Sequence, residues 1–183
     1  MRQGEEAAHE KTSPMLLFSW ETIEGLTLAL TARVLADGRP DLLVLLQRGG
    51  LIPGVLLSHQ LSVSEMLCVP IRRTTSEQIY ADKQTPVLVV PEEASHLTGK
   101  DVVIVDDIAG SGETMRAVCS ALAAFQPFRL RTMVYLVNLN HWEHIHRPPE
   151  QEITYIGQTI RAWAVFPWEK SASTLVAPEG EAR

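Results

Sequence analysis

Two adjacent carboxylates stand at the centre of the most informative stretch of this sequence. Asp106 and Asp107 follow four apolar residues, 102–105, and precede a run of small residues. A buried strand would deliver both carboxylates to its carboxyl end, which is where ligands collect in open α/β sheets. Carboxylate oxygens at such an edge suit sugar hydroxyls or a hydrated Mg²⁺.

The small residues after the two acids could hold a phosphate. Ala109, Gly110, Ser111 and Gly112 come first, and Glu113 and Thr114 follow them. Glycines let backbone N–H groups approach an anion, and the helix expected after them adds unpaired N–H donors and a favourable dipole at its start. Ser111 and Thr114 add hydroxyls, so one phosphate is expected over residues 110–114. The structural alternative, a strand joined to a helix by a flexible turn, does not require two acids before the loop.

Two other phosphate-binding loops are excluded by the same residues. A Walker A loop needs Gly-Lys-Ser/Thr, and this loop has no lysine. A dinucleotide-binding loop needs Gly-x-Gly-x-x-Gly, and Met115 stands where the last glycine should be.

The elements that must position the loop follow from the apolar pattern. Short apolar runs predict strands at 42–46, 66–71, 86–91, 102–105, 133–137 and 153–156. Three- and four-residue apolar spacing or a proline near the first turn predicts helices at 19–36, 53–60 and 115–125, with Ser19 as an N-cap. Strands that alternate with helices predict an α/β fold with a central, mostly parallel sheet flanked by helices.

Length and charge bound the domain count and the partners. The chain has 183 residues, enough for one domain, and its 16 Lys plus Arg against 22 Asp plus Glu give a net charge of −6. We predict a disordered lead-in at 1–14, one domain at 15–170 and a flexible tail at 171–183. Net negative charge makes nucleic acid an unexpected partner, because non-specific binding depends on basic side chains.

The sequence shows neither targeting signals nor cysteine spacings that would hold a metal. No segment approaches the ~18 apolar residues of a membrane span, and residues 1–14 lack the apolar core of a secretory signal. The two cysteines, Cys68 and Cys119, lie in apolar stretches without metal-ligand spacing. We therefore expect a cytoplasmic protein with no membrane partner.

Three segments resemble one known family. Residues 102–114 resemble the phosphoribosyl-pyrophosphate (PRPP) signature of type I phosphoribosyltransferases. Residues 47–54 resemble the family's pyrophosphate loop, and residues 161–169 resemble the base-binding segment of xanthine-guanine phosphoribosyltransferases. The resemblance spans roughly residues 15–170 and implies the type I phosphoribosyltransferase fold, with a small hood at its C-terminal edge over the base site.

The resemblance also implies an activity and roles for individual residues. The family transfers a 5-phosphoribosyl group from PRPP to a ring nitrogen of a base, here a purine-like one, and releases pyrophosphate with Mg²⁺ as cofactor. Asp106 and Asp107 would be the catalytic pair that holds the ribose hydroxyls and the metal. Residues 109–114 would bind the 5-phosphate, and Arg48, Gly49 and Gly50 would bind pyrophosphate. Arginine suits this because its planar fork pairs two phosphate oxygens.

The base site and the flap are implied in the same way. Trp163 would stack on the base beside Ala164, and Asn138 could hydrogen-bond it. Core packing is the alternative for Trp163 and, more evenly, for Trp168. The family's mobile flap would fall in the polar segment 72–85, with the candidates Arg72, Arg73 and Lys83.

Two departures from the family pattern leave the acceptor open. Enzymes for 6-oxopurines usually carry an Asp where this chain has Gly110, and a Lys near the strand end that here reads Val-Asn-Leu-Asn at 137–140. A transferase for an unusual heterocycle is therefore one alternative. A PRPP- or nucleotide-sensing regulator with the same fold is another. The resemblance also implies a homodimer or homotetramer. The cluster His141–His146 is a further alternative site, for a transition metal.

Overall fold

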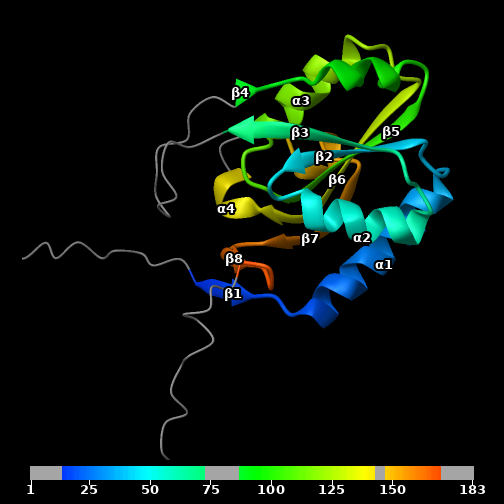
Figure 1. Ribbon diagram of the computed structural model, residues 1–183. Coiled ribbons are helices and arrows are strands. Elements are labelled where there is room, and N and C mark those ends of the chain that lie inside the picture. The colour runs from blue at the N-terminus through cyan, green and yellow to red at the C-terminus, as the bar shows by residue number, and fades with distance from the viewer. Residues whose placement is uncertain (1–13, 73–86, 143–146, 170–183) are drawn as a thin grey trace, which may run out of the picture.

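The computed structural model describes residues 14–72, 87–142 and 147–169. A six-stranded sheet in the order β4-β3-β2-β5-β6-β7 forms its centre (Figure 1). All neighbours pair in parallel except β3 and β4, which are antiparallel. The strands are β2 (Leu42–Gln47), β3 (Met66–Arg72), β4 (Val87–Leu88), β5 (Asp101–Ala109), β6 (Arg129–Asn138) and β7 (Tyr155–Ile160). The predicted α/β class with a mostly parallel sheet is confirmed.

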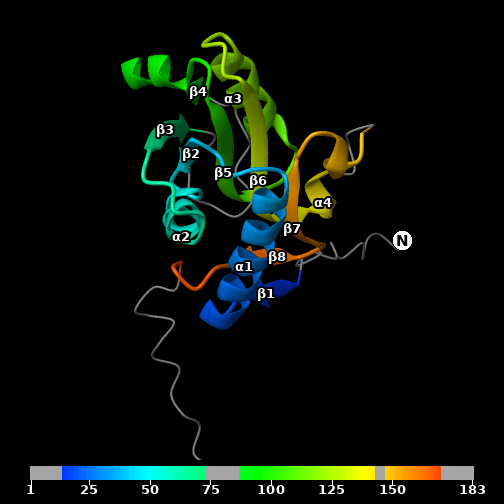
Figure 2. The ribbon, with the colours of Figure 1, turned by 90° about the vertical axis from the view of Figure 1, so that its right-hand side faces the viewer.

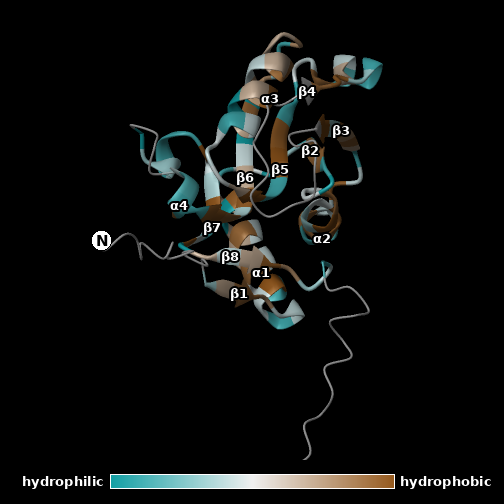
Figure 3. Ribbon diagram, turned by 90° about the vertical axis from the view of Figure 1, so that its left-hand side faces the viewer, coloured by the Kyte–Doolittle hydropathy of each residue, from teal (hydrophilic) through white to brown (hydrophobic). Residues whose placement is uncertain are grey.

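Helices cover both faces of the sheet (Figure 2). Helices α1 (Trp20–Ala36) and α2 (Leu51–Leu61) pack on one face, where Ile23 and Leu57 join a buried cluster. Helix α3 (Glu113–Ala123) and the 3₁₀ helix η1 (Glu92–Leu97) pack on the other, through Val118 and Leu97. Because both faces are covered, the central strands are apolar on both sides, which Figure 3 shows along β5.

Helix α1 begins as its sequence predicts. The Ser19 hydroxyl accepts a hydrogen bond from the Thr22 backbone N–H at 3.1 Å, as an N-cap residue does. The helix ends at Ala36, and Gly38 follows with a φ of +106°. A positive φ is readily adopted by glycine, so the predicted stop at this position is confirmed. No helix among the described residues is both long and apolar enough to cross a bilayer.

A second, two-stranded sheet joins the two ends of the described chain. Strand β1 (Met15–Leu17) pairs in parallel with β8 (Trp163–Val165), next to α1 in Figures 1 and 2. Aromatic rings continue this contact, with Phe166 stacked on Trp168 at 4.6 Å between centroids and on Phe18 at 5.8 Å. The ring of Trp168 therefore packs against Phe166 and the core, which is the alternative considered for it above.

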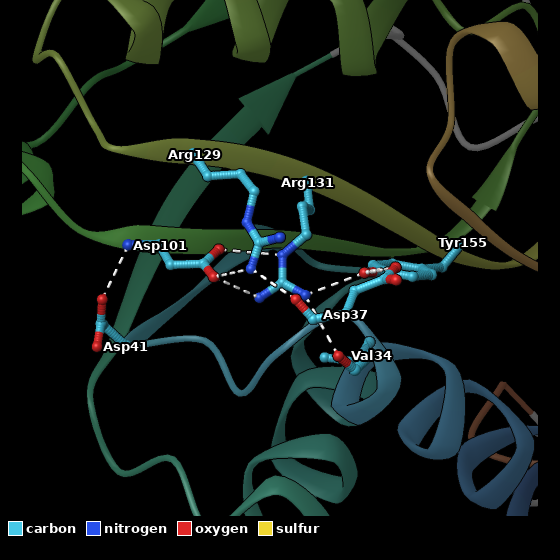
Figure 4. Close-up of polar contacts among 7 residues, drawn as sticks. All are labelled: Val34, Asp37, Asp41, Asp101, Arg129, Arg131 and Tyr155. Atoms are coloured by element: carbon cyan, nitrogen blue, oxygen red, sulfur yellow. Dashed lines mark hydrogen bonds and ion pairs between the residues drawn. The ribbon is translucent and has the colours of Figure 1, made fainter.

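A buried polar cluster ties the amino ends of the strands to α1 (Figure 4). Asp101 accepts from Arg131 through Nε at 3.0 Å and Nη2 at 2.9 Å, and also pairs with Arg129. The Tyr155 hydroxyl accepts from Arg131 at 3.0 Å and donates to Asp37 at 2.7 Å. Four elements, namely β5, β6, β7 and the end of α1, therefore meet through one ion-pair network.

Several boundaries differ from those predicted, and two strands were missed. Strand β5 continues past the apolar run at 102–105, because Asp106, Ile108 and Ala109 pair with buried residues of β6. The strand predicted at 153–156 is β7, Tyr155–Ile160, and Ile153 is buried just before it. Other shifted or missed elements are α2, which begins at Leu51, α3 (Glu113–Ala123), β6 (Arg129–Asn138), β4 (Val87–Leu88), β1, β8, η1 (Glu92–Leu97), α4 (Leu139–Trp142) and the 3₁₀ helix η2 (Pro149–Gln151).

Candidate active site

The paired carboxylates lie within the last part of β5 and are half-buried. Their oxygens accept local backbone hydrogen bonds: Asp106 Oδ1 from the Asp107 N–H at 3.0 Å, and Asp107 Oδ1 from the Ile108 N–H at 2.7 Å. Each carboxylate is thus oriented before any ligand arrives. Such fixed oxygens at a sheet edge are suited to sugar hydroxyls and to hard cations.

Burial raises the pKa of Asp107 from 3.8 to about 7. The hydrogen bond from the Ile108 N–H lowers it, and the nearby negative charge of Glu169 raises it further. Glu169 therefore lies near Asp107, and sequence reasoning included it only as the last residue of the segment 161–169. The signal available was its place at the end of the segment 161–169, after a proline and a tryptophan.

The loop after β2 lies directly against these carboxylates. A Cβ atom on Gly49 would stand 2.3 Å from Asp107 Oδ1 and 2.8 Å from Asp106 Oδ1. A Cβ atom on Gly50 would stand 2.1 Å from the Val105 carbonyl oxygen. A side chain at either position would displace its neighbours. In the same loop, the peptide bond between Gln47 and Arg48 is cis. The structure thus brings the predicted pyrophosphate loop and the predicted catalytic pair together.

The predicted phosphate loop ends where α3 begins. Gly112, the N-cap residue, has a φ of +75° and makes no side-chain capping hydrogen bond. The Thr114 hydroxyl is buried and has no hydrogen-bond partner among the described residues. Buried hydroxyls are normally paired, so this one is available to a bound group. A helix start without a side-chain cap and with a spare hydroxyl fits an anion such as phosphate.

The residues predicted to contact the base differ in their surroundings: Trp163 is exposed, whereas Asn138 is hydrogen-bonded within the fold. Trp163 on β8 is 37% exposed, whereas Ala164 packs against the core. Asn138 is buried, donates from Nδ2 to the Ala162 carbonyl at 3.0 Å and accepts at Oδ1 from the Asn140 N–H at 3.1 Å. Asn138 therefore fixes the turn before β8, and contact between its amide and a base stays a prediction.

The flap and histidine candidates fall mostly outside the described residues. Arg73, Lys83 and residues 143–146 are not among those that the structure describes, and Arg72 is the last residue of β3. The arrowhead of β3 points toward the side of the sheet where β2 also ends (Figure 1). Strand β3 thus ends at the carboxyl edge of the sheet, which also carries the carboxylates of β5.

Asp106 and Asp107 are the carboxylates of this site that could bind Mg²⁺. In the described part of the chain, no group of three or more His, Cys, Asp and Glu side chains is placed to hold a metal. Mg²⁺ is usually bound by one or two carboxylates together with substrate phosphates and water. The carboxylates of Asp106 and Asp107 fit that mode, in which PRPP itself would complete the coordination.

Comparison with known proteins identifies the family. The family model described as phosphoribosyl transferase domain matches residues 19–172. Xanthine-guanine phosphoribosyltransferase from Idiomarina loihiensis is 26% identical over 98 residues, a match that spans 54% of this chain and 58% of that protein. The enzyme of the same name from Ruegeria sp. is 26% identical over 161 residues, 82% of this chain and 83% of that one.

A relative with a different name and a solved structure also match. The bifunctional protein PyrR from Actinobacillus pleuropneumoniae is 34% identical over 67 residues, which is 37% of each chain. The crystal structure of a purine phosphoribosyltransferase from Pyrococcus horikoshii superposes with a TM-score of 0.67 at 24% identity, and covers 86% of this chain and 95% of that one. That likeness is one of fold. Because the family model matches residues 19–172, which are most of the chain, the chain belongs to the phosphoribosyltransferase family.

Proposed function

We propose that this protein transfers the 5-phosphoribosyl group of PRPP to a ring nitrogen of a purine-like base and releases pyrophosphate, with Mg²⁺ as cofactor. The observation that carries the proposal is the close approach of Gly49 to both carboxylates. A Cβ atom built on Gly49 would lie 2.3 Å from Asp107 Oδ1 and 2.8 Å from Asp106 Oδ1. The loop would then bind the pyrophosphate and the two acids would bind the ribose, on either side of the C1–oxygen bond that breaks.

The residues divide the work by the charge that each part handles. Backbone N–H groups at 110–114 and the Thr114 hydroxyl bind the 5-phosphate, and Arg48 with the Gly49–Gly50 backbone binds pyrophosphate. Asp106 and Asp107 hold the ribose hydroxyls, and bound Mg²⁺ would offset the charge of the leaving pyrophosphate. The bond from C1 to the pyrophosphate oxygen breaks through an oxocarbenium-like state, and the base nitrogen bonds to C1. The N–H proton of the base is then released to solvent, and Gly110 has no side chain that could accept it.

The acceptor is proposed only as a flat, purine-like heterocycle. Trp163 presents an exposed indole on the hood, and stacking tolerates many bases. Gly110 and the absence of a lysine in 137–140 remove two charged contacts to the base. A base outside the common 6-oxopurines is therefore included in the proposal, since unpaired polar groups change discrimination by orders of magnitude.

Pyrophosphate release tests the proposal. The protein is mixed with PRPP, Mg²⁺ and one base at a time from a panel of purines and other heterocycles. We expect release with at least one base and its loss in the variant Asp106→Asn/Asp107→Asn. Glu150→Gln, which changes an exposed carboxylate outside the site, is the matched control. Release that survives the double substitution contradicts the assigned roles.

A second candidate function is suggested by the match to PyrR. In that reading the site binds PRPP or a nucleotide as a signal and turns over slowly or not at all. The same assay separates the two, because a sensor would bind PRPP tightly without releasing pyrophosphate. A homodimer or homotetramer is proposed for either function, and light scattering of the purified chain measures it.

A further inference from the structure

An indole ring from another part of the chain supports the phosphate loop. Trp142 is the last residue of α4, is 3% exposed, and donates from Nε1 to the Arg147 carbonyl at 2.8 Å. A Cβ atom on Gly112 would stand 2.6 Å from Cη2 and 2.9 Å from Cζ3 of this ring. The six-membered part of the indole therefore rests against the backbone at the start of α3.

The segment that carries Trp142 makes a second contact near the same place. Arg116, in the first turn of α3, donates from Nη1 to the Ser111 carbonyl at 3.3 Å. The same nitrogen forms an ion pair with Glu152, whose side chain is 11% exposed. Trp142 thus supports the loop at Gly112 through its ring, and Glu152 supports it at Ser111 through Arg116.

Helix α3 begins at the end of this loop, with a backbone conformation that its surroundings must hold. Its N-cap is Gly112, at a φ of +75° and without a side-chain cap. A glycine has more conformational freedom than any other residue, so the positive φ must be held by its surroundings. The buried hydroxyl of Thr114, without a partner among the described residues, lies two positions further on.

We propose that Trp142 is a positioning residue for the 5-phosphate of the ribosyl donor. Its ring holds Gly112, and with it the N–H groups of residues 110–114, in the geometry that binds a phosphate monoester. This inference rests on the proposed function. Trp142 does not act on the pyrophosphate loop, because Gly49 and Gly50 lie against Asp106, Asp107 and the backbone of β2 and β5. A change at Trp142 should therefore alter the affinity for the 5-phosphate and leave the affinity for pyrophosphate unchanged.

Calorimetric titration with ribose 5-phosphate and, separately, with pyrophosphate and Mg²⁺ tests this separation. Trp142→Phe removes the indole atoms that reach Gly112 and the donor to Arg147 but keeps an apolar ring. We expect a loss of about tenfold or more in affinity for ribose 5-phosphate, with pyrophosphate affinity unchanged, because small misplacements of binding groups are costly. The matched control is Leu122→Ala, which makes a cavity under α3 away from the loop and should leave both affinities unchanged.

A second readout uses the unsubstituted ring. In a variant whose other tryptophans, Trp20, Trp163 and Trp168, are phenylalanine, the emission of Trp142 should change with ribose 5-phosphate and not with pyrophosphate. If Trp142→Phe fails to fold, this titration decides, and an unresponsive Trp142 overturns the inference. So does a folded Trp142→Phe that binds ribose 5-phosphate normally, or one that loses both ligands equally. Failure of the unsubstituted protein to bind either ligand overturns the proposed function, and this inference with it.

Discussion

At the scale of single residues, the burial of Asp107 links the site to stability. Its folded pKa of about 7 lies above the ordinary value of 3.8, so the folded state keeps a proton that the unfolded state has lost between these pH values. Ionisation of Asp107 therefore destabilises the fold progressively as pH rises from about 4 to about 7, and the full cost persists above that. Glu169 adds to this cost through its like charge.

Asp107→Asn tests this effect, because the substitution removes the charge and keeps the shape. We expect the variant to be more stable than the parent at about pH 8, by ~4 kcal/mol at most, and little different at about pH 4. Urea denaturation at the two pH values measures the difference. Glu150→Gln is the control, and a stability gain of equal size at both pH values would contradict the assignment.

Gly49 is the residue whose substitution should do most harm to ligand binding. An alanine Cβ would enter the space of Asp107 Oδ1 at 2.3 Å, so the loop or the carboxylate must move. We expect Gly49→Ala to weaken pyrophosphate binding on the order of 100-fold. The matched control is Gly25→Ala on α1, where a Cβ meets nothing within 4 Å. Calorimetry on both variants is the measurement, and normal pyrophosphate binding by Gly49→Ala would show that the loop does not need this contact.

At the scale of elements, the cluster around Arg131 locks β5, β6, β7 and α1 together at the edge of the sheet remote from the carboxylates (Figure 4). Arg131 is 3% exposed and forms two hydrogen bonds with Asp101. A buried charge that loses its partner is strongly destabilising, whereas an exposed pair contributes little.

Asp101→Asn should therefore lower the free energy of unfolding by about 3–5 kcal/mol. Lys100→Gln, which breaks the exposed pair with Glu65, should change it by less than about 1 kcal/mol. Chemical denaturation gives both values, and pyrophosphate binding by the folded Asp101→Asn should equal that of the parent. A change below that of Lys100→Gln would mean that the cluster does not hold the strands.

The elements also show how far sequence patterns reach. Apolar runs on both faces predicted β2 and β5, and the apolar spacing predicted α3, although the helix begins at Glu113, two residues earlier than predicted. Strands β1 and β8 have three residues each and no buried period, so only their pairing reveals them. The Glu169–Asp107 proximity and the Trp142–Gly112 contact join segments far apart in sequence, and no local pattern encodes either one. The hydrogen bonds of Asn138 within the fold were likewise beyond sequence reasoning.

At the scale of the whole molecule, a net charge of −6 coexists with the anion site that we propose. In the proposed site, backbone N–H groups, the start of α3 and Arg48 would supply positive potential locally, which suits small phosphates. A long polyanion instead needs many basic side chains along a surface.

We therefore expect no binding of duplex DNA or RNA at about 150 mM salt, while PRPP still binds. Fluorescence anisotropy with a labelled duplex checks this, with Glu150→Lys as a control for a small change of charge. Tight, salt-sensitive binding of RNA would favour the regulator over the transferase.

The most direct test of the transferase assignment is the identity and amount of the product. PRPP, Mg²⁺ and each base of the panel are incubated with the protein, and ribotide and pyrophosphate are measured together by mass spectrometry and an enzymatic assay. We predict that one base yields ribotide and pyrophosphate in equal amounts, and that Asp106→Asn/Asp107→Asn yields neither. Tight PRPP binding without ribotide from any base would contradict the assignment.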